Sequence, residues 1–131
     1  MQPEACFKKH LREGFTAACG TTPQYWFPIV ASMMQKAGVP DLFIADGKIG
    51  CWVEAKVNGN GLSPIQALEQ RKMAMAGAIV IVLHCDLAPK KEFRVIDRGA
   101  FLRSGEYVWT PRYASWGDTN TPLFWKAAIH G

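Results

Sequence analysis

The sequence predicts an α/β fold built on a mixed β-sheet that is flanked by helices. Residues 42–57 are a predicted β-hairpin, because an apolar run and an alternating run are joined by the tight-turn dipeptide Asp46-Gly47. A helix is predicted over residues 64–76, and the wholly apolar residues 78–83 predict a central strand that is covered on both sides. A helix between two strands makes a crossover connection, so the strands on either side of it are expected to run parallel.

Length and composition indicate one globular domain. The 131 residues are enough to bury a core without staples, so we expect a single domain over residues 1–131, with a core over about 3–97 and an aromatic-rich C-terminal extension over about 98–131. Hydrophobic residues make up 49% of the chain, yet no apolar run approaches the length of a membrane span. No basic stretch followed by an apolar one marks a secretory signal, so a cytoplasmic location is expected.

The net charge bears on the kind of partner, and the cysteine spacing bears on disulfides and metal sites. The formal net charge of +4 is compatible with a polyanionic partner without requiring one. The four cysteines are widely scattered, with no Cys-x-x-Cys pair and no histidine at zinc-ligand spacing. We therefore expect reduced thiols rather than disulfides or a metal site, with Cys51 and Cys85 buried in strands.

Residues 3–14 are predicted as the first helix, with a proline in its first turn and Gly14 as a plausible stop. Phe7 and Leu11 are four apart and form its apolar stripe. Glu4 lies three positions before Phe7, on or beside the inward face. This leaves two interpretations of Glu4: an acid that favours the positive end of the helix, or a third carboxylate of a metal site.

Other stretches give weaker patterns. Residues 15–27 are predicted as a loop leading into an irregular aromatic segment, and residues 29–36 fit a short helix or a connecting strand. A strand is predicted at 93–96 and a short turn of helix at 100–103. The tail from 107 to 131 holds three tryptophans without clean periodicity, so it fits either a dimer surface or a satellite core cluster.

The returning strand of the hairpin separates an apolar face from a charged one. Side chains two apart point to the same side, so Trp52, Glu54 and Lys56 share one face, while the apolar residues between them face the core. Asp41 opens the first strand, and pairing across the turn brings it near the level of Glu54. Two adjacent carboxylates repel each other, and a divalent cation with oxygen ligands is the usual remedy. The plainer alternatives are that Asp41 caps a turn and that Glu54 and Lys56 form an exposed ion pair.

The helix at 64–76 carries clear start and stop signals. Ser63 is a good N-cap, a proline follows at the first helical position, and Gln66 stands three residues after Ser63 as in a capping box. Gly77 is the expected breaker at the other end. Residues 69–72 are predicted to form a solvated, partly basic face. The predicted buried stripe consists of the apolar residues Ile65, Leu68 and Met75.

Four motifs follow one another in order: Gly38-Val39-Pro40-Asp41, then Glu54-Ala55-Lys56 on a strand, then Leu62-Ser63-x-x-Gln66 at a helix start, then the apolar strand. This order resembles the PD-(D/E)xK nuclease superfamily, and it is most similar to the small stand-alone VRR-NUC domain of phages and prophages. The resemblance covers residues 3–85. It implies a restriction-endonuclease-like core, with a central mixed sheet and elements in the order αβββαβ.

The resemblance also implies catalytic roles. Asp41 and Glu54 match the family's catalytic, metal-binding carboxylates, and Lys56 matches its catalytic lysine. Gln66 matches its glutamine at the start of the following helix, although completing the capping box is an equally good account of that side chain.

A metal site with additional ligands follows from the same resemblance. Glu4 matches the acid of the family's first helix, with Glu13 as the alternative third acid. The backbone carbonyl of Ala55 is a further expected ligand. Mg²⁺ or Mn²⁺ is the expected ion, since such hard cations prefer oxygen ligands.

The function that the resemblance implies is a divalent-metal-dependent DNA endonuclease that hydrolyses phosphodiester bonds. It is expected to select branched DNA such as Holliday junctions in phage or prophage DNA processing, to work as a homodimer, and to act in the host cell cytoplasm if phage-encoded. The alternatives are a non-catalytic nucleic-acid-binding module of the same fold and an unrelated structural protein. The candidate DNA contacts are the basic residues Lys48, Arg71, Lys72, Lys8 and Arg12.

Overall fold

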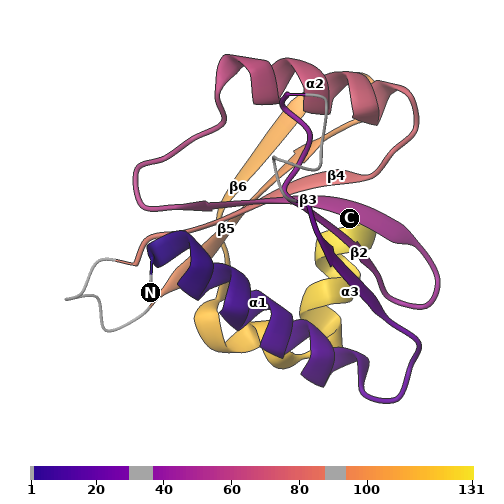
Figure 1. The fold of residues 1–131 in the computed structure, drawn as a ribbon, viewed down its shortest axis with the longest axis vertical. Coiled ribbons are helices and arrows are strands. Elements are labelled where there is room, and N and C mark those ends of the chain that lie inside the picture. Colours follow the sequence, from indigo (N-terminus) through magenta and orange to yellow (C-terminus); the bar gives the residue numbers. More distant parts are fainter. Residues whose placement is uncertain (1, 30–36, 88–93) are drawn as a thin grey trace.

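A six-stranded mixed sheet forms the centre of the molecule, and its strands lie side by side in the order in which they occur along the chain (Figure 1). The computed structural model describes residues 2–29, 37–87 and 94–131. The third and fourth strands pair in parallel, and every other neighbouring pair is antiparallel. The strands are β1 (Tyr25–Pro28), β2 (Leu42–Ala45), β3 (Gly50–Val57), β4 (Val80–Cys85), β5 (Val95–Phe101) and β6 (Tyr107–Ser115).

Helices cover both faces of this sheet. Figure 1 shows α1 and α3 on one face and α2 on the other. The order of one helix, three strands, a second helix and a parallel strand is the predicted αβββαβ order, and the predicted α/β fold with a mixed sheet is confirmed. Within the described residues, no helix is long and apolar enough to cross a membrane. The helices are α1 (Pro3–Cys19), α2 (Pro64–Met75), the 3₁₀ helix η1 (Trp116–Asn120) and α3 (Pro122–His130).

The first helix is longer than predicted, and Gly14 does not end it. α1 runs on to Cys19, and Gly20 follows with a positive φ of 57°. Gly14 is buried against η1, where a Cβ would come within 2.5 Å of the Thr119 carbonyl oxygen. The glycine is needed for close approach to a segment about a hundred positions later, which a local stop signal cannot reveal.

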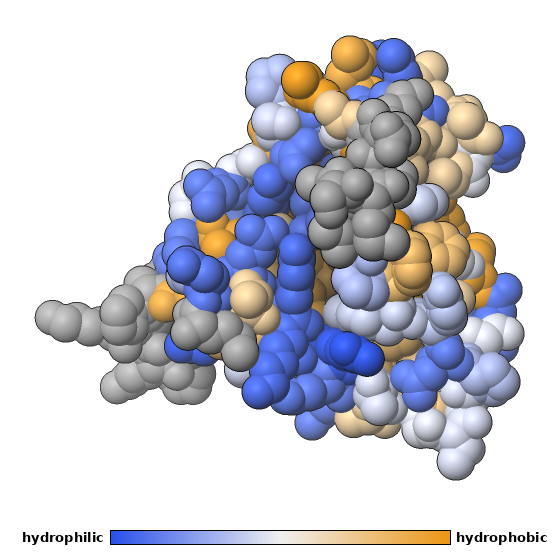
Figure 2. All heavy atoms as spheres, in the orientation of Figure 1, coloured by the Kyte–Doolittle hydropathy of each residue, from blue (hydrophilic) through white to orange (hydrophobic). Residues whose placement is uncertain are grey.

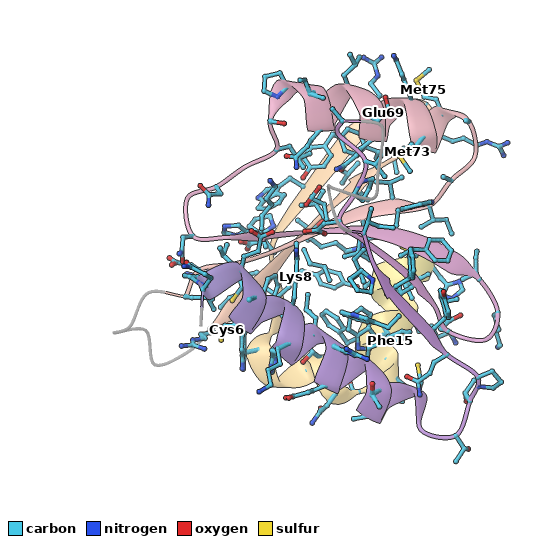
Figure 3. The ribbon with its side chains drawn as sticks, in the orientation of Figure 1. Cys6, Lys8, Phe15, Glu69, Met73 and Met75 are labelled. Atoms are coloured by element: carbon cyan, nitrogen blue, oxygen red, sulfur yellow. The ribbon has the colours of Figure 1, made fainter. Side chains whose placement is uncertain are left out.

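The predicted buried stripe of α2 is wrong, although its predicted cap is correct. Ser63 and Gln66 form the capping box. The apolar residues Ile65, Leu68 and Met75 are 58%, 56% and 50% exposed, and hydrophobic residues accordingly show over α2 in Figure 2. In Figure 3, Met75 points away from the sheet. The residues of α2 that are fully buried are Gln70, predicted to be solvated, and Ala74.

Two further predictions are corrected by strand pairing. Residues 25–28, predicted to lie in a loop and an irregular segment, form the edge strand β1, where a proline is tolerated because one side of the strand needs no hydrogen bond. The helical turn predicted at 100–103 is wrong, since residues 100 and 101 end β5. The alternatives for 29–36 lie almost entirely outside the described residues, as does residue 93 of the strand predicted at 93–96.

The C-terminal segment joins the main core rather than forming a satellite cluster. β6 closes one edge of the sheet, and Trp125 of α3 packs edge-on against Phe15 of α1 at 5.0 Å between ring centroids. Trp116 of η1 stacks on His10 at 3.6 Å. Cys51 and Cys85 are buried in strands as predicted, and no disulfide links the four cysteines, all of which lie in the described part of the chain.

Candidate active site

Hairpin register brings the two predicted carboxylates together. Leu42 pairs with Val53, so Asp41 lies beside Glu54 at the next level of the ladder. The Asp41 Oδ1 atom accepts a hydrogen bond from the Ala55 N–H at 3.3 Å. Asp41 therefore lies just before the first residue of β2, and Glu54 lies in the middle of β3.

The first turn of α1 contributes a third acid. One carboxylate oxygen from each of Glu4, Asp41 and Glu54 lies within 4.8 Å of the other two. Of the two acids considered for this position, Glu4 reaches the cluster, while Glu13 is an exposed residue outside it. Three carboxylates in one place present oxygen donors only, which is the ligand chemistry of hard divalent cations.

The carboxylates of the cluster are unfavourably placed for ionisation, because Glu54 is buried and Asp41 is half-buried. Glu54 is 2% exposed, and desolvation together with the nearby Asp41 charge raises the pKa of Glu54 to about 8. Burial also raises the pKa of Asp41, although the neighbouring Lys8 opposes this effect. Positive charge is therefore needed if both carboxylates are to be ionised at neutral pH.

Lys8 supplies part of that positive charge. Its Nζ lies 2.8 Å from Asp41 Oδ2 and 3.3 Å from Glu4 Oε1, and Figure 3 shows the side chain reaching from α1 towards the sheet. Lys8 is predicted from the sequence as a DNA contact on the helix surface, whereas its ammonium lies in the acidic cluster. The spacing of Glu4 and Lys8, which is i and i+4 on one helix, is the signal that could have revealed this.

Two glutamines of α2 hold the buried glutamate. Gln66 Nε2 and Gln70 Nε2 donate hydrogen bonds to Glu54 Oε1 at 3.2 and 2.9 Å. Gln66 Oε1 also accepts from the Ser63 N–H at 3.0 Å, so Gln66 completes the capping box and contacts the site at once. Sequence reasoning missed Gln70, although its i+4 spacing from Gln66 places both amides on one face of the helix.

Lys56 follows Glu54 on the same face of β3. It lies opposite His84 of β4, it is half-buried, and it makes no ion pair with any described residue. Its charge opposes the rise in the pKa of Glu54. The ammonium thus acts on Glu54 through its charge and forms no ion pair with a described carboxylate.

The other predicted basic residues lie apart from the carboxylates. Arg71 and Lys72 are exposed on α2, and Lys48 is exposed in the turn of the hairpin, which lies at the far end of β3. Arg12 is closer, because it lines a cavity of about 240 Å³ between α1 and β1 that also borders Lys8 and Asp41.

Comparison with known proteins finds similarity among solved structures alone. The chain matches no protein family and no curated protein. Among solved structures it is similar to Hjc, a Holliday junction resolvase from the archaeal hyperthermophile Archaeoglobus fulgidus, with 16% identity, a TM-score of 0.49, and coverage of 72% of this chain and 74% of the other. A likeness of this extent says nothing about activity, so function rests on the residues of the site.

Proposed function

We propose that the chain is a divalent-metal-dependent DNA endonuclease of the PD-(D/E)xK type. The observation that carries this proposal is the meeting of Glu4, Asp41 and Glu54 within 4.8 Å, beside the half-buried Lys56. Buried acids are costly unless cations or hydrogen-bond donors compensate them, so such a cluster favours a function that needs bound positive charge.

The donor set fits Mg²⁺ or Mn²⁺. Glu4, Asp41 and Glu54 would hold the ion, with the backbone carbonyl of Ala55 as the further ligand implied by the family resemblance. When bound, a divalent ion supplies Lewis-acid chemistry: it lowers the pKa of water and neutralises charge on a phosphate group.

The chain's own side chains account for the remaining requirements of phosphodiester hydrolysis. Lys56, on the same face of β3 as Glu54, would orient the attacking water and stabilise the negative charge that develops on the phosphate. Gln66 and Gln70 both donate to Glu54 Oε1, which fixes the carboxylate and leaves its Oε2 without a donor from α2. A carboxylate held in this way is preorganised rather than free to rotate.

The proposed substrate is branched DNA such as a four-way junction, in phage or prophage DNA processing, cut by a VRR-NUC-like homodimer. A dimer suits a substrate whose two strands are cut symmetrically. The basic residues Lys48, Arg71, Lys72 and Arg12 are proposed phosphate contacts, and Lys8 could join them only after leaving the carboxylates.

The test is a cleavage assay on labelled duplex, nicked, flapped and four-way-junction DNA, with Mg²⁺, Mn²⁺ or EDTA. We expect metal-dependent cutting by the wild-type chain, abolished by EDTA and by Asp41→Ala. DNA binding without cutting under every condition would instead assign the chain to the class of non-catalytic nucleic-acid-binding modules. A chain that neither binds nor cuts DNA would contradict both the nuclease and the binding-module functions.

A further inference from the structure

The face of the sheet that carries Glu54 is covered by α2 over only part of its area. α2 packs at one end of this face, where Ala74, Val80 and Phe101 form a small apolar cluster. The cross-strand partners Lys56, His84 and Asp97 lie beyond that cluster on the same face, since directly paired residues point to the same side of a sheet. None of these three belongs to either apolar cluster of the described residues.

Strand register places an aromatic residue in line with the buried glutamate. Glu54 pairs with Val82, Val82 with Gly99, and Gly99 with Trp109 of β6. Trp109 therefore shares the face of Glu54 at a distance of three strands, which is about 14 Å at the usual strand spacing of about 4.8 Å. That distance is a few nucleotides along a DNA strand.

Trp109 and Tyr107 form an exposed aromatic pair at this position. They are 45% and 38% exposed, and their ring centroids are 6.4 Å apart at an interplanar angle of 34°. Gly99 makes room for the pair, because a Cβ at that position would overlap the Tyr107 hydroxyl group. A second exposed pair, Tyr25 and Phe27, lies on β1 at the opposite edge of the sheet, so exposure alone does not single out Tyr107 and Trp109; their place in line with Glu54 does.

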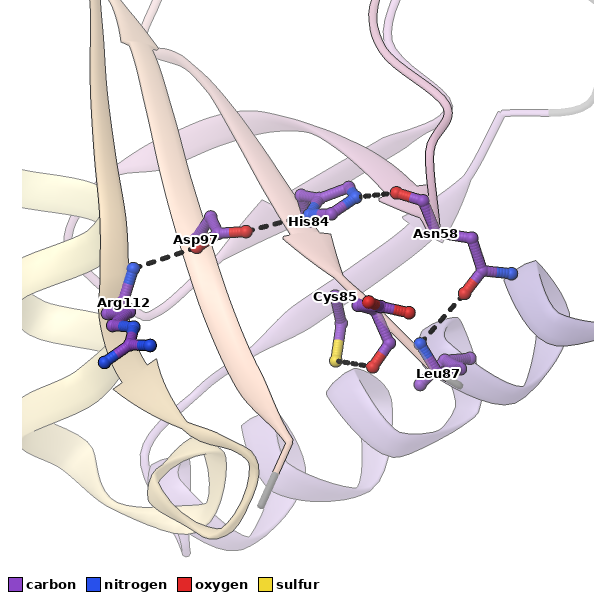
Figure 4. A network of polar contacts seen from close by, with 7 residues as sticks. Asn58, His84, Cys85, Leu87, Asp97 and Arg112 are labelled. Atoms are coloured by element: carbon purple, nitrogen blue, oxygen red, sulfur yellow. Dashed lines mark hydrogen bonds and ion pairs between the residues drawn. The ribbon is translucent and has the colours of Figure 1, made fainter. Parts of the chain in front are cut away.

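A polar network fixes the surroundings of Trp109 (Figure 4). The His84 ring, 6.0 Å from the Trp109 ring, contacts Asp97 Oδ2 through Nδ1 at 2.9 Å and the Asn58 carbonyl through Nε2. The Arg112 N–H donates to Asp97 Oδ1 at 2.8 Å. The network ties β4, β5 and β6 to the turn that follows the Glu54–Lys56 strand, so the aromatic pair is held in a fixed relation to the site.

We propose that Tyr107 and Trp109 form a stacking surface for unpaired bases of the DNA substrate. This inference rests on the proposed function and deepens it: the substrate class is DNA that has unpaired nucleotides close to the cleaved phosphate, rather than intact duplex. Aromatic faces bind bases of any sequence by stacking, but only where the bases are not already stacked in a duplex.

Charge and size favour DNA over a second copy of this chain as the occupant. Exposed cations lie on the same strand at Arg112 and on α2 at Arg71 and Lys72, as a polyanion requires. On the Glu54 face, β6 presents the exposed pair Tyr107 and Trp109, since Val108 points to the other face. Two partly exposed side chains cover much less than the about 800 Å² per partner that a stable dimer buries.

The test measures binding to fluorescent single-stranded, splayed and fully paired DNA by anisotropy, in Ca²⁺ or EDTA so that cleavage does not interfere. Trp109→Ala should weaken binding to single-stranded and splayed DNA by about five-fold or more and leave duplex binding unchanged, since stacking on one aromatic residue has about that value. Trp109→Phe should retain most of the affinity. Gly99→Ala, which displaces Tyr107 without removing it, should cause a partial loss.

Leu123→Ala is the matched control, because Leu123 is 75% exposed on α3, on the opposite face of the sheet. Equal losses on duplex and splayed DNA, or no loss on either, would overturn the inference. So would a Trp109→Ala protein that changes from dimer to monomer while its DNA selectivity stays the same. The cleavage assay is separate: a wild-type chain that cuts DNA without any preference for unpaired bases refutes this inference alone, and one that shows the preference but never cuts refutes the nuclease alone.

Discussion

At the scale of single residues, Lys8 and a divalent cation compete for the same carboxylates. The ammonium lies 2.8 Å from Asp41 Oδ2 and 3.3 Å from Glu4 Oε1, so a metal ion bound by these acids must displace it. The displaced side chain would enter the neighbouring cavity beside Arg12, where a DNA phosphate could receive it. Metal binding and DNA binding would then reinforce each other.

Lys8→Met is therefore expected to bind Mn²⁺ several-fold more tightly than the wild-type chain in the absence of DNA, measured by calorimetry. Without metal the variant should be less stable by about 1–3 kcal/mol, because the half-buried Asp41 loses its compensating charge. Lys9→Met is the control, since Lys9 is exposed and makes no ion pair with a described residue. Unchanged or weaker Mn²⁺ binding by Lys8→Met would refute the competition.

Ionisation of Glu54 should make the free energy of unfolding fall as the pH rises. Its pKa is about 8 in the folded chain and about 4.5 when solvated, so the folded state holds the proton more tightly than the unfolded state does. The resulting stabilisation is complete below about pH 4.5 and is lost as the pH rises through 8. Glu54→Gln, which mimics the protonated side chain, should remove this fall. Denaturant titrations between pH 4.5 and 9 measure the free energy of unfolding of both proteins. If it fell equally with pH in the wild type and in Glu54→Gln, Glu54 would not be the cause.

At the scale of elements, hydrogen bonds rather than apolar residues set the rotation of α2. Gln70 is fully buried and bonds Glu54, whereas Leu68 two positions earlier is 56% exposed. Gln70→Ala should lower the free energy of unfolding by about 1–3 kcal/mol, because it leaves buried polar groups without a partner. Leu68→Ala should change it by less than about 0.5 kcal/mol. Urea titrations measure both changes. A larger loss for Leu68→Ala than for Gln70→Ala would indicate that α2 buries its apolar stripe, as the sequence predicts.

The substitution Gly14→Ala tests how tightly α1 packs against η1. Alanine has the higher helix propensity, by about 0.5–1 kcal/mol, but its Cβ would come within 2.5 Å of the Thr119 carbonyl oxygen. Overpacking of this kind costs about 1–3 kcal/mol, so Gly14→Ala should lower the melting temperature despite the gain in propensity. Gly117→Ala, where a Cβ meets no atom within 4 Å, should leave it nearly unchanged. A Gly14→Ala protein that melts higher than the wild type would show that the contact is loose.

At the scale of the whole molecule, the sequence predicts those parts whose partners are joined by a recognisable connection, such as a tight turn or a crossover helix. The hairpin, the capping box at Ser63 and the parallel pairing of β3 with β4 all follow from local patterns, and Asp41 and Glu54 meet because one tight turn sets their register. The errors named next lie where no recognisable connection in the sequence indicates the partner. β1 exists through its pairing with β2, Gly14 is shaped by η1, and Lys8 is directed by an acid 33 positions away.

The same distinction separates the predicted and the missed parts of the site. Residues of the hairpin could be assigned from spacing, because alternation fixes which side chains share a face. Gln70 and the pair of Tyr107 and Trp109 depend on how α2 and β6 lie against the sheet, which no local pattern specifies. A polar residue on a helix or an aromatic residue on a strand can serve many purposes. The role of Gln70 is seen from its hydrogen bond to Glu54, and that of Trp109 from the register of β6 on β5.

The proposed nuclease activity requires the carboxylate cluster and Lys56 to act together on a phosphodiester bond. The most direct measurement is the single-turnover cleavage rate of one labelled four-way junction at saturating Mn²⁺, for the wild-type chain and for Lys56→Ala, with Mn²⁺ binding checked by calorimetry. We predict that the wild type cuts the junction and that Lys56→Ala binds Mn²⁺ but cuts it at least about 100-fold more slowly, as for the loss of one acid–base or charge-stabilising group. Equal rates for the two proteins, or no cutting by either, would contradict this proposal.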